Sequence, residues 1–431
     1  MSTITLEEIL AYHHNGKISL NLTRDLKSQR DLSLAYTPGV AQAVKAIAAN
    51  PDTAFKLTAR SNLVAVVTDG TAILGLGDLG PDASIPVMEG KAVLFKAFAD
   101  VDGWPVPLAH CRKDGANTGP TDPQRIIDTV LAIAPMYGGI NLEDIASPAC
   151  FEIEDRLDEL LDIPVFHDDQ WGTAVITLAG LINYATLTDR PLNTLRVIIN
   201  GAGAAGIRIA DMCKAAGVVD LVMYDSKGAI TTNRTDLTPH KRRHAVATAP
   251  TALTKGIAGA HVFIGVSVAD IICGADVKTM ANFPAIFAMA NPDPEISPAA
   301  VAAALGNLPY VMATGRSDYP NQINNVLGFP FIFRGALDVR ARTINTAMKV
   351  AAAEALAKLA RQPVPDSVKL LYPHEQLEFS TSYLIPKPFD RRLFVEVSHA
   401  VATAAVNSGA APTTDLPQLL TSLQQRSLSL S

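Results

Sequence analysis

The sequence predicts an α/β fold in which parallel strands are covered by helices on both faces. From Thr173 onward, short apolar runs alternate with helical patterns, first at residues 197–200, 204–216 and 221–225. Apolar runs without polar alternation are typical of strands buried on both faces of a parallel sheet. The chain has 431 residues, 48% of them hydrophobic and 18% charged, which is enough to form the cores of two or three domains.

The overall charge argues against two classes of partner. The formal net charge is -6, with no basic excess, so neither nucleic acid nor an anionic membrane surface is expected to bind.

No apolar run reaches the roughly 20 residues that a membrane-spanning helix needs, and the first residues lack a signal-peptide pattern. The four cysteines are far apart, which suits reduced thiols, so the sequence predicts a cytoplasmic protein.

Residues 1–160 are expected to form a first, substrate-binding domain of mixed strands and helices. The apolar runs 62–68 and 72–76 flank Asp69-Gly70, which predicts a β-hairpin. Tyr36 falls in a turn just before the helix that Pro38 opens. The other elements expected here are a strand near 104–108 and helices over 5–14, 38–50, 86–99, 123–133 and 151–161.

Residues 161–340 are expected to form a second domain, and residues 341–431 to form helices that pack back on the first. A helix over 173–186 opens the second domain. Its later strands are expected at 261–267, 285–291 and 310–314. The long C-terminal helices are expected over 343–361 and 390–408, joined by a proline-rich loop over 362–387.

One glycine pattern has the context of a dinucleotide-binding loop. Gly201, Gly203 and Gly206 follow an apolar strand, and a helix begins at Ala204. Backbone amides and the helix N-terminus can therefore meet a pyrophosphate. Asp225 ends the next strand, where a carboxylate can accept a hydrogen bond from a ribose hydroxyl. The pattern predicts a Rossmann-type domain that binds NAD, with NADP as the alternative.

The choice between the two dinucleotides depends on the end of that strand. Because a carboxylate repels a 2′-phosphate, Asp225 favours NAD. Lys227 is close enough in sequence to weaken this preference.

A second glycine pattern, formed by Gly75, Gly77 and Gly80, lacks the same context. Pro81-Asp-Ala-Ser follows it in place of an early helix. We therefore expect a loop that lets two backbones pass closely.

Two acidic pairs follow short apolar runs. Asp168 and Asp169 come after one run, and Glu143 and Asp144 come after another. One acidic pair alone would be a solvated surface feature, but two pairs at strand ends beside a cofactor loop are expected to converge. Such oxygen ligands suit a hard divalent cation, Mg(II) or Mn(II).

Several further residues have an ordinary structural explanation beside a functional one. Most lysines are solvated, so Lys91 alone would be a charge on a helix face. Tyr36 would be a packed turn residue and His167 a hydrogen-bonded core residue. Asn291 and Asn325 follow expected parallel strands, where ligands bind, but asparagine also favours turns.

Taken together, the motifs of residues 34–409 resemble the malic enzyme family, in its compact prokaryotic form. The motifs that carry the resemblance are Tyr36-Thr-Pro-Gly-Val40, Ile73-Leu-Gly-Leu-Gly-Asp-Leu-Gly80, Val87-Met-Glu-Gly-Lys91, Asn141-Leu-Glu-Asp144, Phe166-His-Asp-Asp-Gln170 and Thr314-Gly-Arg-Ser-Asp-Tyr-Pro-Asn-Gln-Ile-Asn-Asn325. Members of this family oxidise malate with NAD or NADP and decarboxylate the product to pyruvate. The resemblance therefore implies an oxidoreductase with a small-molecule substrate, malate or oxaloacetate, and a homodimer or higher homo-oligomer.

The resemblance also implies a role for each site residue. Tyr36 would be the general acid and Lys91 the general base, with Asp168 as the partner of the lysine. The metal ligands would be Glu143, Asp144 and Asp169. Asn291 and Asn325 would bind the substrate, and Asn291 also lies at the expected cofactor site.

The chain departs from the family pattern at three places. Trp171 stands where compact members usually have histidine, which we expect to alter the wall of the site. Segments 102–123 and 364–384 are enlarged, and Ala72 replaces a substrate-binding arginine of larger members. Two alternatives stay open: an oxaloacetate decarboxylase of the same family, and a nucleotide-binding regulator that needs neither lysine nor metal.

Overall fold

The computed structural model describes residues 4–116 and 118–430, and it contains two mainly parallel sheets. The first sheet has four strands in the order β2-β1-β3-β4, and every adjacent pair is parallel. Its strands are β1 (Leu63–Thr68), β2 (Asp102–Pro107), β3 (Gly139–Leu142) and β4 (Val165–His167). Parallel neighbours need crossover connections, which are supplied by α5 (Pro81–Ala99), α6 (Pro123–Ile133) and α7 (Ala149–Leu160).

The second sheet has six strands in the order β10-β9-β8-β5-β6-β7. They are β5 (Arg196–Asn200), β6 (Asp220–Asp225), β7 (Gly228–Ala229), β8 (Val262–Gly265), β9 (Ala285–Ala288) and β10 (Val311–Thr314). Only the short edge strand β7 runs antiparallel to its neighbour. The strand order reverses between β5 and β8, and such a switch point is where doubly wound folds bind ligands.

The second sheet is buried on both faces, which confirms the predicted fold class. Val197 and Ile199 of β5 pack into one apolar core, whereas Ile198 packs into another core on the opposite face. Phe263 of β8 lies on the same face as Ile198. Such burial explains why these strands contain no polar alternation.

The larger apolar core is continuous from the first sheet to the second. Its central helix is α8 (Thr173–Leu187), which packs against α9 (Ala204–Ala215) and α15 (Thr346–Ala360). The C-terminal half also contributes α14 (Phe329–Asp338), α17 (Arg392–Asn407) and α18 (Leu416–Ser429). Helix α14 packs on both α5 and α17, so it lies between the first domain and the C-terminal helices.

Shorter helices complete the two domains. They are α10 (Pro239–Arg242), α11 (Leu253–Gly256), α12 (Gly274–Val277), α13 (Pro298–Leu305), α16 (Asp366–Lys369), and the 3-10 turns η2 (Ala59–Ser61), η3 (Ile73–Gly75), η4 (Ala134–Met136), η6 (Leu192–Thr194) and η7 (Asn325–Leu327). One π-helical turn, η5 (Asp168–Gly172), joins β4 to α8. Among the described residues, no helix is both long enough and apolar enough to cross a membrane.

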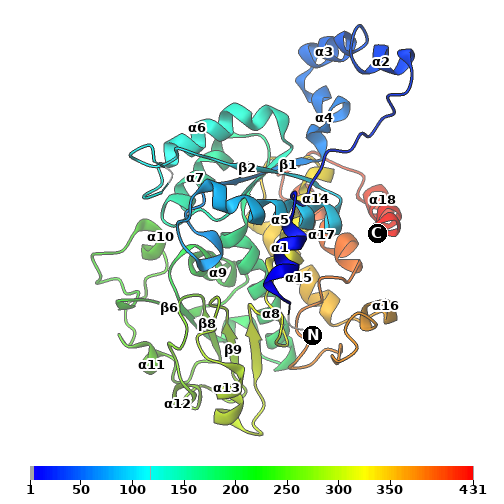
Figure 1. Ribbon diagram of the computed structural model, residues 1–431. Helices are drawn as coiled ribbons and strands as arrows, with labels where there is room; N and C mark the ends of the chain where they lie inside the picture. Colours follow the sequence, from blue (N-terminus) through cyan, green and yellow to red (C-terminus); the bar gives the residue numbers. More distant parts are fainter. Residues whose placement is uncertain (1–3, 117, 431) are drawn as a thin grey trace.

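An N-terminal arm stands away from this body (Figure 1). Helix α1 (Leu6–His13) is followed by Lys17, whose backbone N–H donates to Glu89 of α5 across 3.1 Å. The chain then leaves the body to form α2 (Gln29–Ala35), α3 (Val40–Ala49), η1 (Pro51–Thr53) and α4 (Ala54–Leu57), and returns to β1. We call residues 18–58 the arm.

The predicted hairpin at 62–76 is wrong. Both edges of β1 are occupied by parallel strands, β2 and β3, so no edge remains for a returning strand. The chain turns away after Asp69, whose side chain accepts hydrogen bonds from Thr71 and Thr121 across 2.6 Å each, and forms η3.

Three boundaries also differ from those expected. Helix α5 begins at Pro81, five residues before the predicted start, because proline is well suited to the first helical turn. Residues 416–429 form α18, which the sequence patterns did not indicate. Strand β4 belongs to the first sheet, so the division between the sheets falls near residue 168 and not at residue 160.

Candidate active site

The two acidic pairs meet at the carboxyl ends of two strands of the first sheet. Because β3 and β4 are parallel neighbours, Glu143 and Asp144 leave the sheet beside Asp168 and Asp169. One carboxylate oxygen each from Glu143, Asp144 and Asp169 lies within 4.8 Å of the other two. The backbone N–H of Asp144 donates to Asp169 across 2.8 Å, which holds the two loops together.

The electrostatics of these carboxylates fit a cation. Burial raises the pKa of Glu143 well above its usual range, despite the nearby Lys91. Burial, followed by the charge of Asp169, raises the pKa of Asp144 to about 7. Among the described residues, Asp144 Oδ2 and Asp168 Oδ1 are buried without a hydrogen-bond partner. Buried acceptors that repel one another are what a hard divalent cation would satisfy.

Lys91 is the cation that this site already contains. Its Nζ forms ion pairs with Asp168 and, across 3.1 Å, with Glu143 Oε1. It also lies 4.6 Å from the centre of the Phe329 ring, and only 14% of its side chain is exposed. Burial alone would lower the pKa of Lys91, but the charges of Asp168, Glu143 and Asp169 raise it above its usual value. The lysine is therefore a buried, ion-paired group and not a solvated charge.

Asn325 joins the same cluster from the second half of the chain. Its Nδ2 donates to Asp168 Oδ2 across 3.2 Å, and its Oδ1 accepts from Thr173 across 3.0 Å. The adjacent Asn324 instead caps η7 by accepting from the backbone of Val326. One asparagine of the pair thus lies at the site, and the other has the turn role that asparagine favours.

Asn291 approaches the site from the far side. It is exposed, and its carbonyl oxygen would lie 3.5 Å from a Cβ placed on Gly75. The neighbouring Leu74 donates its backbone N–H to Asp144 Oδ1 across 3.4 Å. The glycine loop after β1 therefore lies between the carboxylates and Asn291.

Backbones pass closely at the end of this loop, because a Cβ on Gly70 would lie 2.3 Å from the carbonyl oxygen of Gly80. The expectation that no early helix follows these glycines is wrong, since α5 begins at Pro81.

The glycines of the cofactor loop are needed for close backbone approach. Gly201 has a φ of +117°, and a Cβ there would lie 2.6 Å from the carbonyl oxygen of Val266. A Cβ on Gly206 would lie 1.9 Å from the carbonyl oxygen of Gly201. Gly203 directly precedes α9, and Ala204 is its first residue, so the helix N-terminus points its free N–H groups at this loop.

Asp225 ends β6 as predicted, but its carboxylate is already occupied. Arg234 donates to both oxygens, across 2.8 and 3.0 Å, and Lys241 donates across 2.8 Å. Although burial opposes ionisation, these bonds lower the pKa of Asp225 to about 2. The Nζ of Lys227, by contrast, pairs with Asp236. The argument for NAD from a free carboxylate therefore loses its physical basis.

Tyr36 lies apart from the carboxylate cluster and Lys91. It follows α2 on the arm and is 69% exposed, whereas Lys91 lies on α5 in the body (Figure 1). Within one chain the two residues do not meet.

Known proteins of one family resemble both halves of the chain. Residues 15–158 match the family described as "Malic enzyme, N-terminal domain", and residues 171–383 match "Malic enzyme, NAD binding domain". The chain belongs to the malic enzyme family.

Relatives within this family cover nearly the whole chain. An NADP-dependent malic enzyme of Rhizobium meliloti is 51% identical over 95% of this chain, which spans 53% of that protein. An NADP-dependent malic enzyme of Halomonas elongata is 49% identical, covering 95% of this chain and 96% of its own length. The crystal structure of a malic enzyme from Pyrococcus horikoshii superposes with a TM-score of 0.87 at 38% identity, covering 98% of this chain and 95% of that one. The chain thus spans about half of one relative and nearly all of another.

The malic enzyme motifs did not indicate the contact that joins the two domains beside the site. Arg208 of α9 donates to Gln170 across 2.8 Å and to Glu154 of α7 across 3.2 Å. Glu154 also accepts the backbone N–H of His167, so it fixes the end of β4. The available signal for this role was Arg208 itself, a charged residue between the apolar Ile207 and Ile209 of α9.

Trp171 is part of that contact and not of the site wall, which corrects our expectation. The Trp171 side chain is 7% exposed and lies between two cations, Lys349 Nζ at 3.5 Å and the Arg208 guanidinium at 4.4 Å from the ring centre. His167, next to the carboxylates, is fully buried, and burial lowers its pKa to about 3. It is therefore a neutral core histidine, but the expected hydrogen bond is not found, since neither ring nitrogen has a hydrogen-bond partner among the described residues.

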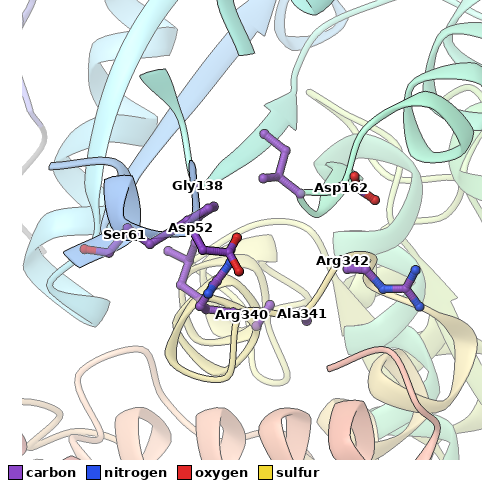
Figure 2. Close-up of a pocket in the computed structure, with 11 residues that line it drawn as sticks. Asp52, Ser61, Gly138, Asp162, Arg340, Ala341 and Arg342 are labelled. Atoms are coloured by element: carbon purple, nitrogen blue, oxygen red, sulfur yellow. The ribbon is translucent and has the colours of Figure 1, made fainter. Parts of the chain in front are cut away.

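A separate cavity of about 280 Å³ lies at the root of the arm (Figure 2). It is lined by Gly138, which directly precedes β3, and by Ile163, which precedes β4. These residues lie at the amino ends of β3 and β4, whereas Glu143 and Asp168 follow the carboxyl ends of the same strands. The cavity is therefore distinct from the malic enzyme site.

Proposed function

We propose that this chain catalyses the metal-dependent oxidative decarboxylation of malate to pyruvate and carbon dioxide, with NAD or NADP as the hydride acceptor. The observation that carries the proposal is the contact of Lys91 with Asp168 and Glu143, beside the three clustered carboxylates. A nucleotide-binding regulator would need neither the buried lysine nor the carboxylates. Membership of the malic enzyme family supports the same reaction.

Glu143, Asp144 and Asp169 would hold the divalent cation, Mg(II) or Mn(II). When bound, the cation polarises the oxygen atoms of the substrate and offsets the charge of the carboxylates around Lys91. Asp169 keeps 35% of its side chain exposed, so the cluster opens towards solvent on that side. Substrate would enter there.

Lys91 acts as the general base for the malate hydroxyl. Asp168 fixes its amine, and Asn325 fixes Asp168 in turn through the bond at 3.2 Å. This chain of contacts holds Nζ at one place beside the carboxylates, which general base catalysis requires. Asn325, which contacts Asp168, and Asn291, which lies beside the glycine loop after β1, would bind the substrate carboxylate groups.

Tyr36 acts after carbon dioxide has left, when a proton must be added to carbon. We propose that it comes from a second copy of the chain in a homodimer. The arm supports this arrangement because it exposes many large apolar side chains, which single chains rarely do over one segment. These side chains are Leu20, Leu22, Leu26, Leu32, Leu34, Tyr36, Val40, Val44 and Leu57.

One assay tests the proposed reaction against its rivals. Formation of NADH or NADPH from malate is followed by absorbance with Mg(II) or Mn(II), and again with chelator. Metal-dependent reduction together with pyruvate formation is expected. Decarboxylation of added oxaloacetate without any malate oxidation would instead show the decarboxylase. The cytoplasmic location expected from the sequence stays a prediction, supported by four free thiols.

A further inference from the structure

The loop after β6 lies where doubly wound folds distinguish NAD from NADP. In doubly wound folds, the carboxylate at the end of this strand receives the hydroxyls of the adenine-linked ribose. An ionised carboxylate has about four acceptor positions. For Asp225, donors fill all four: two from Arg234, one from Lys241, and the backbone N–H of Lys227 at 3.0 Å.

Asp225 therefore has a structural role in holding the loop. Its side chain is only 9% exposed, and Arg234 links it to Asp236 through further bonds at 3.0 and 2.9 Å. The Arg234 guanidinium has no free donor for a ligand, because its remaining N–H groups reach the carbonyl oxygens of Gly228 and Ala229. Arg234 and Asp225 together make a rigid base for the two lysines.

The lysines keep the capacity to bind an anion. Lys241 makes one ion pair, with Asp225, and Lys227 makes one, with Asp236, so each ammonium retains two donors. The side chains of Lys227 and Lys241 are 67% and 26% exposed. Three cations face two carboxylates in this cluster, which leaves it with a net positive charge.

The cluster also borders open space. A cavity of about 370 Å³ is lined by Lys227 and Arg234 together with Thr231 and Asn233. Positive charge at the border of an open cavity is the arrangement that attracts a phosphate group.

We infer that Lys241 and Lys227 bind the 2′-phosphate of NADP, and that Asp225, held by Arg234, does not repel it. The inference rests on the proposed use of a dinucleotide and assigns the residues that select it. NADP is then preferred to NAD, in place of the preference that Asp225 alone suggests.

Binding of two adenosine fragments tests whether the lysines bind a 2′-phosphate, and it needs no catalytic turnover. Adenosine 2′,5′-bisphosphate and AMP differ in the 2′-phosphate, and calorimetry of the whole protein with chelator and no malate compares their affinities. We expect the bisphosphate to bind about tenfold or more tightly, equivalent to about 1.4 kcal/mol. The difference should decrease with added salt. Equal affinities, or no binding of either fragment, would overturn the inference.

Three variants assign the effect to residues. Lys241→Gln and Lys227→Gln should each reduce the preference for the bisphosphate and leave AMP binding unchanged. Lys278→Gln, an exposed lysine on the same domain after α12, is the matched control and should change neither. Asp225→Asn, which loosens the loop that holds the lysines, should weaken binding of the bisphosphate more than binding of AMP, whereas an equal tenfold loss for both fragments would make the carboxylate a ribose acceptor and overturn the assignment.

The binding result is independent of catalysis. If the chain binds the bisphosphate selectively but does not oxidise malate, the proposed reaction fails and the cofactor assignment stands. If it oxidises malate with NAD and binds both fragments equally, the proposed reaction stands and the cofactor assignment fails.

Discussion

Asn325 donates from Nδ2 to Asp168 Oδ2 across 3.2 Å, and these two residues are separated by 157 positions in the sequence. The contact links η7, after the second sheet, to η5, after the first. Because Asp168 also pairs with Lys91, the proposed base is positioned by both halves of the chain. The predictions below test the parts of this arrangement one at a time.

The first prediction concerns the acidic cluster. Asp169→Asn should reduce Mn(II) affinity at least about tenfold, since it removes a charged ligand. Thermal stability in chelator should not fall, because the asparagine oxygen still accepts from Asp144 and one of several repelling charges is gone. Calorimetric titration with Mn(II) and thermal unfolding with chelator provide the measurements. Asp162→Asn, an exposed acidic residue, is the control, and equal Mn(II) binding in both variants would contradict the assignment.

The second prediction concerns Lys91. Lys91→Ala should lower kcat for malate oxidation by about 10²- to 10⁴-fold, the usual contribution of a general base. Added small primary amines should restore part of the rate if only a base is missing. Lys96→Ala, an exposed lysine on the same helix, should retain activity. Steady-state rates with saturating malate check this, and a Lys91→Ala enzyme within tenfold of the parent would exclude the role.

The third prediction tests whether Tyr36 acts across subunits. Tyr36→Phe and Lys91→Ala should each be inactive in pyruvate formation. Refolding the two variants together should form mixed dimers in which one site has both a tyrosine and a lysine. Random pairing would then give roughly a quarter of the parent activity. If Tyr36 acted within its own chain, every mixed site would lack one group and activity would stay at background.

The fourth prediction concerns the pH dependence of stability. Burial lowers the pKa of Lys349 to about 8, although the carboxylate of Glu154 opposes this. The unfolded chain then binds more protons than the folded chain between pH 8 and about 10.4, so this lysine makes the free energy of unfolding rise with pH. The rise should be roughly 2 kcal/mol across that window. The Lys349→Met variant should lack this rise in the free energy of unfolding.

Urea denaturation of the parent and the Lys349→Met variant at several pH values measures this difference. Comparing the two proteins cancels the contributions of other groups, such as Cys150 and Cys213, whose pKa values burial raises. Lys358→Met, on the same helix, is the control. An unchanged pH dependence in Lys349→Met would show that the lysine is not desolvated in solution.

Local patterns predicted the site where the chemistry itself is local. The glycines of the cofactor loop and the two acidic pairs are short motifs, and their positions at strand ends follow from the apolar runs before them. The pairing of β1 could not be predicted in this way. Its partners β2 and β3 come from later in the chain, and only tertiary structure shows that they occupy both of its edges.

The same limit explains the corrections at Asp225 and Tyr36. The identity and position of Asp225 were predictable, but its partners Arg234 and Lys241 lie 9 and 16 residues later, in a segment without periodicity. The sequence around Tyr36 fits a turn, and the structure agrees. Its distance from Lys91 depends on the direction of the arm, which no local pattern encodes.

In the proposed homodimer, the arm adds a bimolecular step to the folding of this protein. Its helices α2 and α3 contain no buried residue, so the apolar side chains of residues 18–58 gain little from folding within one chain. The body can form its cores alone, whereas the proposed homodimer would cover the exposed apolar side chains of the arm. Recovery of activity after denaturation should therefore be second order in chain concentration, while the cores of the body form at a rate independent of it.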